Sequence, residues 1–481
     1  MKELPGFYYD EEKKRYFPLK GPIPGSGAGS GFRPKPQPSP PIPTRLVPTK
    51  RRKLTQLLDS RELNAPSPSS SRRLLDHHLS HPQVWKYSDR SSSILRADAR
   101  VEHVYMDIQT AEGVSQGDAL ITGSNEGYLS LLRFGSHREH DGETCSPSSV
   151  STKMQPPESV PRIFLPAPVS HVMSSRISSI VLPKRRHSFD DADIRFRRGL
   201  VTTLGFEGVG GSVCCLRLDR PLDYRSNICF LQTIRGIIHM NCTIWSADCN
   251  HDASQAVLGT DLGATLLDIE TSTLSRVLHS KSDVFAQRFD QSGNVVLCGL
   301  RNGAIMKVDI RDRRPIPVSR LRQHRIQIPP KRQKLNPGKQ WFELKGDINP
   351  SGVVWMPSSV CSLVSLASDD HYFLASSMDG SILLYDNRMT SRGAVQAYGG
   401  HINSHSFLQL SVDPSEKFLA SGGEDKNFRL WNIKSGELLL EKRYSGDSTP
   451  MNVSWQTSKS SMSGWSAWFG TEEGIYLMRW R

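Results

Sequence analysis

Over most of the chain, short stretches of alternating apolar and polar residues recur, and each is interrupted by a polar turn that contains Gly or Asn. Alternation with a period of two is typical of strands, and a glycine-bearing turn between two such runs predicts a tight β-hairpin. Seven segments share this pattern: 119–134, 200–219, 256–270, 295–311, 373–388, 418–436 and 467–480. The sequence therefore predicts seven hairpins.

The spacing of these hairpins predicts how they assemble. In three neighbouring pairs of hairpins, equivalent turn residues such as Gly259 and Gly299 are 40 to 47 residues apart. A four-stranded propeller blade takes roughly 40–50 residues. The two longest intervals contain segments 136–192 and 312–345, which we expect to be insertions because their removal restores ordinary blade lengths. The pattern therefore favours an all-β fold, a seven-bladed β-propeller over 100–481 with two long loop insertions.

The end of the last hairpin predicts how the ring closes. Segment 467–480 ends the sequence directly after its third strand, so the fourth strand of that blade has to come from another part of the chain. We expect it to come from residues shortly before or near 100. Such a pairing joins the two ends of the ring and removes its free strand edges.

Residues 1–99 are predicted to form an N-terminal extension. The run 21–48 is rich in Pro, Gly and Ser, which favours disorder. Two leucine-bearing stretches, near 53–63 and 72–79, have the spacing of short amphipathic helices, which are stable only against a surface. Their candidate contact residues are Leu54, Leu57, Leu58, Leu74 and Leu75. Clustered aromatic residues in 4–18 predict an ordered aromatic knob.

Composition changes the picture mainly through the position of the charges. The 481 residues have a formal net charge of +13. Residues 1–99 contain 18 Lys and Arg against 9 Asp and Glu, and residues 311–345 contain 11 against 2. The net positive charge of these two segments together exceeds that of the whole chain, so the predicted blades are mildly acidic. A basic groove on a rigid scaffold is not indicated, and nucleic acid is not expected as the primary partner.

Several classes of function are disfavoured by what the sequence does not contain. There is no apolar run of about 20 residues and no signal peptide, so no membrane association is expected. Eight scattered cysteines without a C-x-x-C pair predict free thiols in a reducing compartment. No phosphate loop or paired acidic motif occurs, so we expect no catalysis and no cofactor. Metal binding is not expected either, because Cys249 with His251, and His77 with His78 and His81, are incomplete ligand sets.

The sixth hairpin carries residues that resemble a WD40 repeat. Gly400-His401 lies about thirty residues before Leu430-Trp431-Asn432. In that family a His, a Ser, an Asp and a Trp form a hydrogen-bonded stack inside the blade, and the resemblance implies this role for His401, Ser421, Asp425 and Trp431. Buried polar groups of this kind satisfy one another. A hydrolase with the same Ser, His and Asp is disfavoured because no G-x-S-x-G motif surrounds Ser421.

Two neighbouring hairpins end in a further motif, Val308-Asp309-Ile310-Arg311 and Tyr385-Asp386-Asn387-Arg388. These endings resemble the WD-x-R endings of WD40 substrate receptors of cullin-4 RING ubiquitin ligases, although neither has Trp before the Asp. The resemblance implies that Arg311 and Arg388, with Asp309 and Asp386, face the linker protein that joins receptor to cullin. The alternative is a local ion pair on a solvated surface, worth about 0–1 kcal/mol.

The N-terminus carries a second resemblance to the same family. Leu4-Pro5-Gly6-Phe7-Tyr8-Tyr9-Asp10, followed by Arg15-Tyr16-Phe17-Pro18, is similar to the opening of one WD-repeat member of the cullin-4-associated factors. This knob is expected either to pack on the propeller or to dock on another protein. Receptors of this family also present an N-terminal helical element to the linker, a role the resemblance implies for the five leucines.

These observations lead to a functional hypothesis. The chain is expected to be a non-catalytic substrate receptor of a cullin-4 ligase that binds a linker of the damage-specific DNA-binding-protein type and an unknown protein target, in the nucleus and cytoplasm. The alternative is a WD40 scaffold in a nuclear RNA-linked assembly such as ribosome biogenesis. Basic runs at 50–53, 184–186 and 331–334 could hold RNA phosphates or serve as nuclear-import signals.

Overall fold

The computed structural model divides the chain into two units, 1–53 and 54–481. The residues that the structure describes are 7–10, 15–18, 81–88, 95–110, 113–135, 144–150, 160–164, 171–183, 198–206, 208–223, 233–311, 318–322, 341–345, 353–444, 447–456 and 465–480.

In the first unit, β1 (Phe7–Asp10) and β2 (Arg15–Pro18) form an antiparallel hairpin, in which Phe7 lies opposite Pro18 and Tyr9 opposite Tyr16. The described part of the predicted aromatic knob is therefore a two-stranded hairpin. The two predicted helices lie outside the described residues, together with Leu54, Leu57, Leu58, Leu74 and Leu75.

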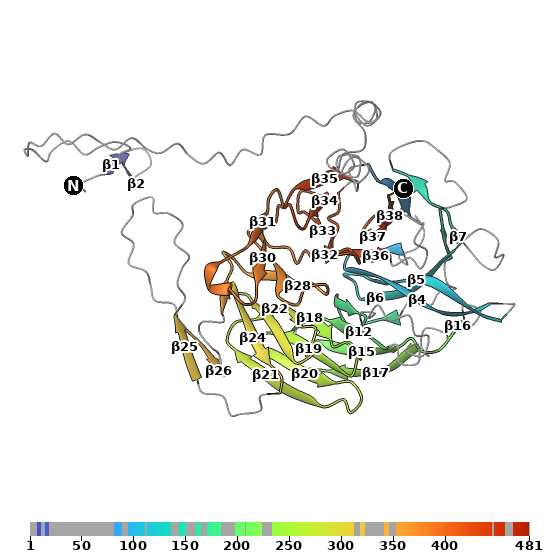
Figure 1. Cartoon of the computed structure of the whole chain (residues 1–481), viewed down its shortest axis with the longest axis horizontal. Coiled ribbons are helices and arrows are strands. Elements are labelled where there is room, and N and C mark those ends of the chain that lie inside the picture. Colours follow the sequence, from blue (N-terminus) through green and yellow to red (C-terminus); the bar gives the residue numbers. More distant parts are fainter. Residues whose placement is uncertain are drawn as a thin grey trace, which may run out of the picture. The chain divides into compact units, whose positions relative to one another are not determined.

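The second unit is a seven-bladed β-propeller whose blades follow one another around the ring in chain order (Figure 1). Each blade is an antiparallel sheet of four strands, and the first strands of neighbouring blades contact each other, as β18 and β22 do. The predicted all-β, seven-bladed fold is confirmed. Each of the seven hairpins expected from the sequence contains the second and third strands of one blade.

The strands of the first four blades are given from the first strand to the fourth. Blade 1 contains β4 (Arg100–Thr110), β5 (Gly113–Gly123), β6 (Tyr128–Gly135) and β9 (Arg162–Phe164). Blade 2 contains β11 (Ile177–Val181), β12 (Arg198–Thr203), β15 (Ser212–Arg217) and β17 (Ile234–His239). Blade 3 contains β18 (Ile244–Cys249), β19 (Gln255–Thr260), β20 (Gly263–Asp268) and β21 (Leu274–Ser280). Blade 4 contains β22 (Val284–Phe289), β23 (Val295–Leu300), β24 (Ala304–Asp309) and β27 (Val354–Trp355).

The remaining three blades follow the same plan. Blade 5 contains β28 (Val360–Ser365), β29 (Tyr372–Ser377), β30 (Ile382–Asp386) and β31 (Gln396–Tyr398), with the 3-10 helix η4 (Thr390–Arg392) before β31. Blade 6 contains β32 (Ser411–Val412), β33 (Phe418–Gly422), β34 (Asn427–Asn432) and β35 (Leu438–Arg443). Blade 7 contains β36 (Val453–Gln456), β37 (Ser466–Thr471), β38 (Gly474–Arg479) and β3 (Gln83–Tyr87).

Eight further strands are accessory to the blades. They are β7 (Thr144–Cys145), β8 (Ser148–Ser149), β10 (His171–Val172), β13 (Gly205–Phe206), β14 (Val209–Gly210), β16 (Leu222–Asp223), β25 (Val318–Arg322) and β26 (Trp341–Lys345).

The two predicted insertions differ from expectation in what they contribute. Segment 136–192 supplies β9 to blade 1 and β11 to blade 2, so it belongs in part to the ring. Both strands lie in a segment that is rich in Ser and Pro, and four of the five residues of β11 are buried. In segment 312–345, the hairpin of β25 and β26 extends the sheet of blade 3 through pairing of β26 with β21.

Ring closure occurs as the sequence predicted. β3 pairs antiparallel with β38, with Trp85 opposite Leu477, and supplies the fourth strand of blade 7. Blade 7 is also bonded to the first strand of blade 1. The backbone N–H of Val101 donates to Asn452 Oδ1 at 3.0 Å, and Asn452 Nδ2 donates to the carbonyl oxygen of Val101 at 2.8 Å. The pairing of β3 and the side-chain hydrogen bonds to β4 thus connect blade 7 to the beginning of the ring.

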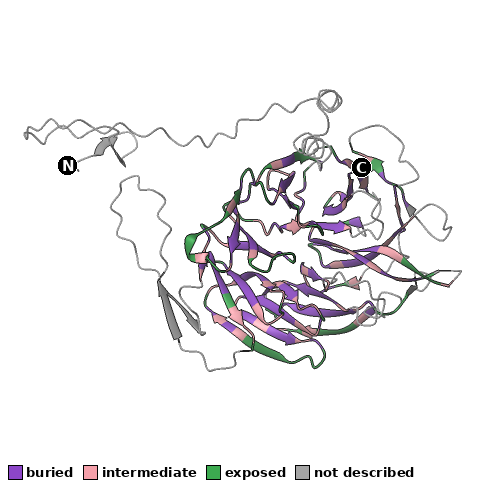
Figure 2. Ribbon diagram, in the orientation of Figure 1, coloured by how far each residue is buried: buried purple, intermediate pink, exposed green. Residues whose placement is uncertain are grey.

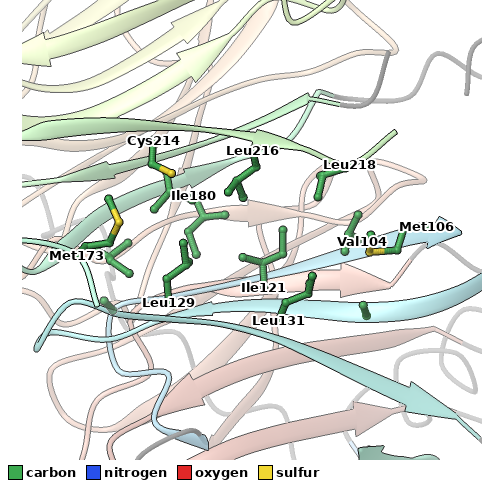
Figure 3. Close-up of a cluster of buried hydrophobic side chains, with 14 of the residues drawn as sticks. Val104, Met106, Ile121, Leu129, Leu131, Met173, Ile180, Cys214, Leu216 and Leu218 are labelled. Atoms are coloured by element: carbon green, nitrogen blue, oxygen red, sulfur yellow. The ribbon is translucent and has the colours of Figure 1, made fainter. Parts of the chain in front are cut away.

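The core consists of apolar layers between neighbouring blades, and the exposed residues gather at turns and outer strands (Figure 2). Figure 3 shows the layer between blades 1 and 2, where Ile121 and Leu131 from blade 1 lie near Ile180 and Leu216 from blade 2. All four side chains are 5% exposed or less. Blade-to-blade packing therefore fixes where each turn lies on the two faces of the ring.

The antiparallel order of strands gives the ring two distinct faces. The turns between first and second strands, and those after third strands, lie on what we call the lower face. The turns between second and third strands, and the connections from one blade to the next, lie on the upper face. A residue's position relative to its strand therefore decides which face it occupies.

Trp85 of the closing strand provides a test of the closure. Its side chain is 4% exposed and packs in a cluster that also contains residues of blade 1. Because truncation of a buried Trp removes apolar contacts and leaves a cavity, we expect Trp85→Ala to destabilise the ring by about 3–5 kcal/mol. Urea unfolding followed by tryptophan fluorescence measures this. Val114→Ala, at a 57% exposed position of β5, is the control and should shift the midpoint little; equal midpoints for both variants would contradict the role of β3.

Candidate partner-binding site

The first Asp-x-Arg ending forms a closed clip at the end of β24. Nε and Nη2 of Arg311 donate to the two carboxylate oxygens of Asp309 at 3.0 and 2.7 Å. The backbone N–H of Arg311 donates to the same carboxylate at 3.0 Å. This parallel, two-point contact fixes the plane of the guanidinium and leaves its outer N–H groups directed away from the carboxylate.

The second ending, at the end of β30, repeats this geometry. Nε and Nη2 of Arg388 donate to Asp386 at 3.1 and 2.9 Å, and the backbone N–H of Arg388 donates at 2.8 Å. The arginine side chains are 66% exposed at Arg311 and 53% exposed at Arg388. Both endings are therefore local ion pairs on a solvated surface, the arrangement that the sequence offered as the alternative, and their guanidinium groups are held in place and open to solvent.

The two clips occupy equivalent positions in neighbouring blades. Asp309 lies opposite the first residue of β23, and Asp386 lies opposite the first residue of β29. Since both follow a third strand, both lie on the lower face, at adjacent blades 4 and 5. The equivalent places in blades 3 and 6 are taken by Asp268 with Glu270 and by Asn432 with Lys434. Among these four consecutive blades, Arg follows the turn residue only in the adjacent pair.

Hydrogen bonds between loops stiffen this part of the lower face. The ring of His251 in blade 3 lies 3.0 Å from the carbonyl oxygen of Gln291 in blade 4, and Gln291 Nε2 donates to Leu366 O in blade 5 at 3.2 Å. From blade 6, the carboxylate of Glu416 accepts the backbone N–H of Ser368 at 2.8 Å. The clips thus project from a continuous belt of connected turns.

Electrostatics make each clip a charge-compensated unit. Hydrogen bonds from Arg311 lower the pKa of Asp309 to about 2, and hydrogen bonds from Arg388 lower the pKa of Asp386. The same contacts raise the pKa of both arginines. Both partners of each clip are therefore ionised at neutral pH, and the pair has no net charge.

The predicted stack in blade 6 forms only in part. Trp431 Nε1 donates to Gly399 O at 2.8 Å and His401 Nε2 donates to Gly422 O at 3.0 Å, while Ser421 Oγ lies 3.4 Å from that nitrogen. These three side chains are 8% exposed or less. The structure differs from the prediction at the fourth residue, Asp425, whose carboxylate binds Arg429.

Arg429 is the residue that the sequence analysis missed in this blade. Its side chain is 1% exposed, and it donates to Asp425 at 2.8 Å through Nη1 and to Glu441 at 3.1 Å through Nε. A carboxylate stabilises a buried guanidinium, and Asp425 therefore binds Arg429 rather than His401, whose pKa is lowered by burial. The sequence feature that could have predicted this network is an arginine within the otherwise apolar core of β34.

Other candidate chemistry is absent from the described part of the chain. It contains no group of three His, Cys, Asp or Glu side chains placed to hold a metal ion. The seven cysteines it includes are free thiols. Nor do these residues include a helix of the length and hydropathy needed to span a bilayer.

The clip geometry predicts that its two members contribute unequally to stability. The side chain of Asp386 is 5% exposed and also holds a backbone N–H, so Asp386→Ala should lower the urea midpoint more than Arg388→Ala does. Because the folded-state pKa of Asp386 is below its ordinary value, this contribution is present above about pH 4 and is lost as the pH falls. Unfolding curves at pH 7 and pH 3 measure it; a pH-independent difference would contradict it.

Comparisons with known proteins agree with the architecture. The family described as WD domain, G-beta repeat matches residues 355–386 and 394–432, in blades 4 to 6. Human DDB1- and CUL4-associated factor 4 is 24% identical over 457 residues, which cover 91% of this chain and 78% of the relative. Its bovine counterpart is 27% identical over 160 residues, covering 33% of this chain and 26% of the relative. Human DDB1- and CUL4-associated factor 4-like protein 2 is 26% identical over 160 residues, covering 33% and 32%.

The similarity to the human factor covers most of this chain. The repeat family matches the blades that carry the second clip and the stack residues. The chain therefore contains WD40 repeats within a seven-bladed propeller and is similar to DDB1- and CUL4-associated factor 4 over most of its length.

Proposed function

We propose that this chain is the substrate receptor of a cullin-4 RING ubiquitin ligase and that it docks on the ligase linker through the lower face of blades 4 and 5. The relatives are named for association with DDB1 and CUL4. The observation that supports the docking surface best is the pair of identical clips, Asp309 with Arg311 and Asp386 with Arg388, on adjacent blades.

The chemistry of the clips suits a protein partner. Each arginine uses Nε and one Nη2 hydrogen on its own carboxylate, so its remaining N–H groups can donate to carbonyl or carboxylate oxygens of the linker. The guanidinium orientation is fixed before binding, which reduces the side-chain entropy lost on association. Lys, a point charge on a flexible stem, cannot reproduce this planar arrangement.

The N-terminal extension would supply a second contact. We assign Leu54, Leu57, Leu58, Leu74 and Leu75 to helical segments that bury their apolar faces against the linker, because short helices need such a surface. In this proposal the chain performs no catalysis. The ligase's RING partner and a charged conjugating enzyme act on a target that this chain holds close, in the nucleus and cytoplasm.

Replacement of both clip arginines tests the docking surface. We expect Arg311→Ala with Arg388→Ala to weaken linker affinity by at least tenfold, about 1.4 kcal/mol, measured by interferometry with purified linker and by pull-down from cells. Arg301→Ala is a matched control, because Arg301 is also 66% exposed and also pairs with a carboxylate, Asp283, but lies on the upper face. Wild-type linker affinity in the double variant would remove the argument from the clips.

Replacement of the leucines tests the second contact separately. Leu54→Asp, Leu57→Asp and Leu58→Asp together place charges on the predicted apolar face, so linker recovery should fall while the melting temperature of the propeller stays unchanged. If the chain instead copurifies with RNA in a salt-dependent way, and removal of 1–80 and 312–345 abolishes that RNA binding, the alternative of an RNA-linked scaffold is favoured.

A further inference from the structure

On the upper face, two neighbouring arginines stand at the beginning of the inner strands of blades 1 and 2. Arg100 is 8% exposed; its Nε donates to Ser178 O at 3.0 Å and its Nη1 to Ala99 O at 3.2 Å. Both acceptors are uncharged carbonyls. Arg176 is half-buried, and its side chain makes no hydrogen bond or ion pair to any described residue. Burial, with a further effect from nearby Arg176, lowers the pKa of Arg100 to about 10.

The carboxylates around this pair are occupied elsewhere. The carboxylate of Asp98 accepts two hydrogen bonds from Asn125, one from the backbone N–H at 3.0 Å and one from Nδ2 at 2.7 Å. Glu126 pairs with Arg96 at 3.2 Å, and Glu102 accepts Ser454 Oγ at 3.0 Å. Within the described ranges, no carboxylate lies at ion-pair distance from either guanidinium. Glu102 and Asp98 favour the charged forms of Arg100 and Arg176 from beyond ion-pair distance, but burial is the larger effect and lowers the pKa of both arginines. An anion from outside the chain would therefore offset the remaining cost of burying the two charges.

Exposed apolar side chains lie on the chain segments that adjoin Arg176. Phe206 is 73% exposed and Val209 is 57% exposed, at the tip of the β13–β14 hairpin. Val172, on β10 shortly before Arg176 in the chain, is 58% exposed. Large apolar side chains with this exposure on consecutive loops are typical of interaction surfaces.

Backbone contacts make the arginines and the apolar tip one surface. Leu204 N donates to the carbonyl of Arg176 at 2.9 Å, and Gly205 N donates to Ser175 Oγ at 2.9 Å. The hairpin is also held against blade 3, since Gly211 N donates to Cys242 O at 2.8 Å. At Gly210, an added Cβ would lie 1.9 Å from Met240 O, so the hairpin fits closely against that loop.

We propose that this surface, formed by Arg100, Arg176, Val172, Phe206 and Val209, binds a peptide segment that carries a carboxylate or phosphate next to apolar residues. The proposal rests on the proposed function in that the segment would belong to the ligase target. A nucleic acid fits less well, because only two cations are present and the carboxylates of Glu102 and Asp98 already act on them. Those carboxylates would repel a continuous phosphate backbone but leave room for a single anionic group.

The position of the surface is compatible with a receptor. It lies on the upper face of blades 1 and 2, whereas both clips lie on the lower face of blades 4 and 5. A target peptide and the linker could therefore be held at the same time.

The test begins with a random peptide library displayed on phage and selected on the full chain. We expect enrichment of sequences with Asp or Glu beside Leu, Ile or Phe. Enriched peptides are then synthesised in acidic, phosphoserine and amide-neutralised forms, and affinities are measured by fluorescence anisotropy. Arg176→Glu should weaken binding of the anionic forms by tenfold or more, and Phe206→Ala by several-fold. The acidic and phosphoserine forms decide which anion is preferred.

Two controls make the result decisive. Arg176 makes no described side-chain bond, so Arg176→Glu should retain the wild-type melting temperature, and Arg301→Glu, elsewhere on the upper face, should leave affinity unchanged. Absence of acidic–apolar enrichment, or equal binding of the enriched peptides by Arg176→Glu and the wild type, would overturn the proposal. So would binding of a labelled homopolymeric RNA at this surface in place of the peptides.

The failures of the two proposals are distinguishable. Arg176→Glu should recover the linker at the wild-type level, and the variant with Arg311→Ala and Arg388→Ala should bind the selected peptides like the wild type. Loss of linker binding without loss of peptide binding concerns the lower face only, and the reverse result concerns the upper face only.

Discussion

The pairing of β3 with β38 is the constraint on which the other features of the ring depend. A row of blades has an open sheet at each end, and each open edge leaves backbone groups without partners. Here a segment that precedes blade 1 supplies the outer strand of blade 7, while Asn452 holds the inner strand of blade 1. Once the ring is closed, the position of each blade is fixed by its two neighbours. The relative placement of Arg311 and Arg388 follows from the packing of blades 4 and 5 against each other within this ring.

The lower face shows how one structural device can carry different functions. In four consecutive blades an Asp or Asn ends the third strand and accepts backbone N–H groups of the following turn, as Asp268 and Asn432 do. This role is structural and needs only the acceptor oxygen. The residue two positions later is not required for the turn, so it can vary. In blades 4 and 5 it is Arg, and a turn-stabilising carboxylate then also orients a guanidinium toward solvent.

Much of the fold could be predicted from the sequence, because the second and third strands of each blade are long enough to alternate and are joined by a turn with a distinctive residue. The short outer strands could not. β9 and β27 have three and two residues, too few for a periodic pattern, and they form because a neighbouring strand offers an edge. The clips were predictable, since their partners are two residues apart. The buried network of Arg429 and the surface around Arg176 were not, because their partners, or lack of partners, depend on loops far apart in the sequence.

The two faces differ most in how their arginines are compensated. Arg311 and Arg388 bring their own carboxylates, so a partner that docks there buries a neutral unit and has to supply only hydrogen-bond acceptors. Arg100 and Arg176 have no carboxylate at ion-pair distance among the described residues, so a partner there gains most by supplying negative charge. The first kind of contact involves no net charge on this chain, whereas the second depends on attraction between opposite charges. A receptor built in this way can bind the linker through oriented hydrogen-bond donors. Its affinity for a target peptide depends on the charge of that peptide, which phosphorylation can change.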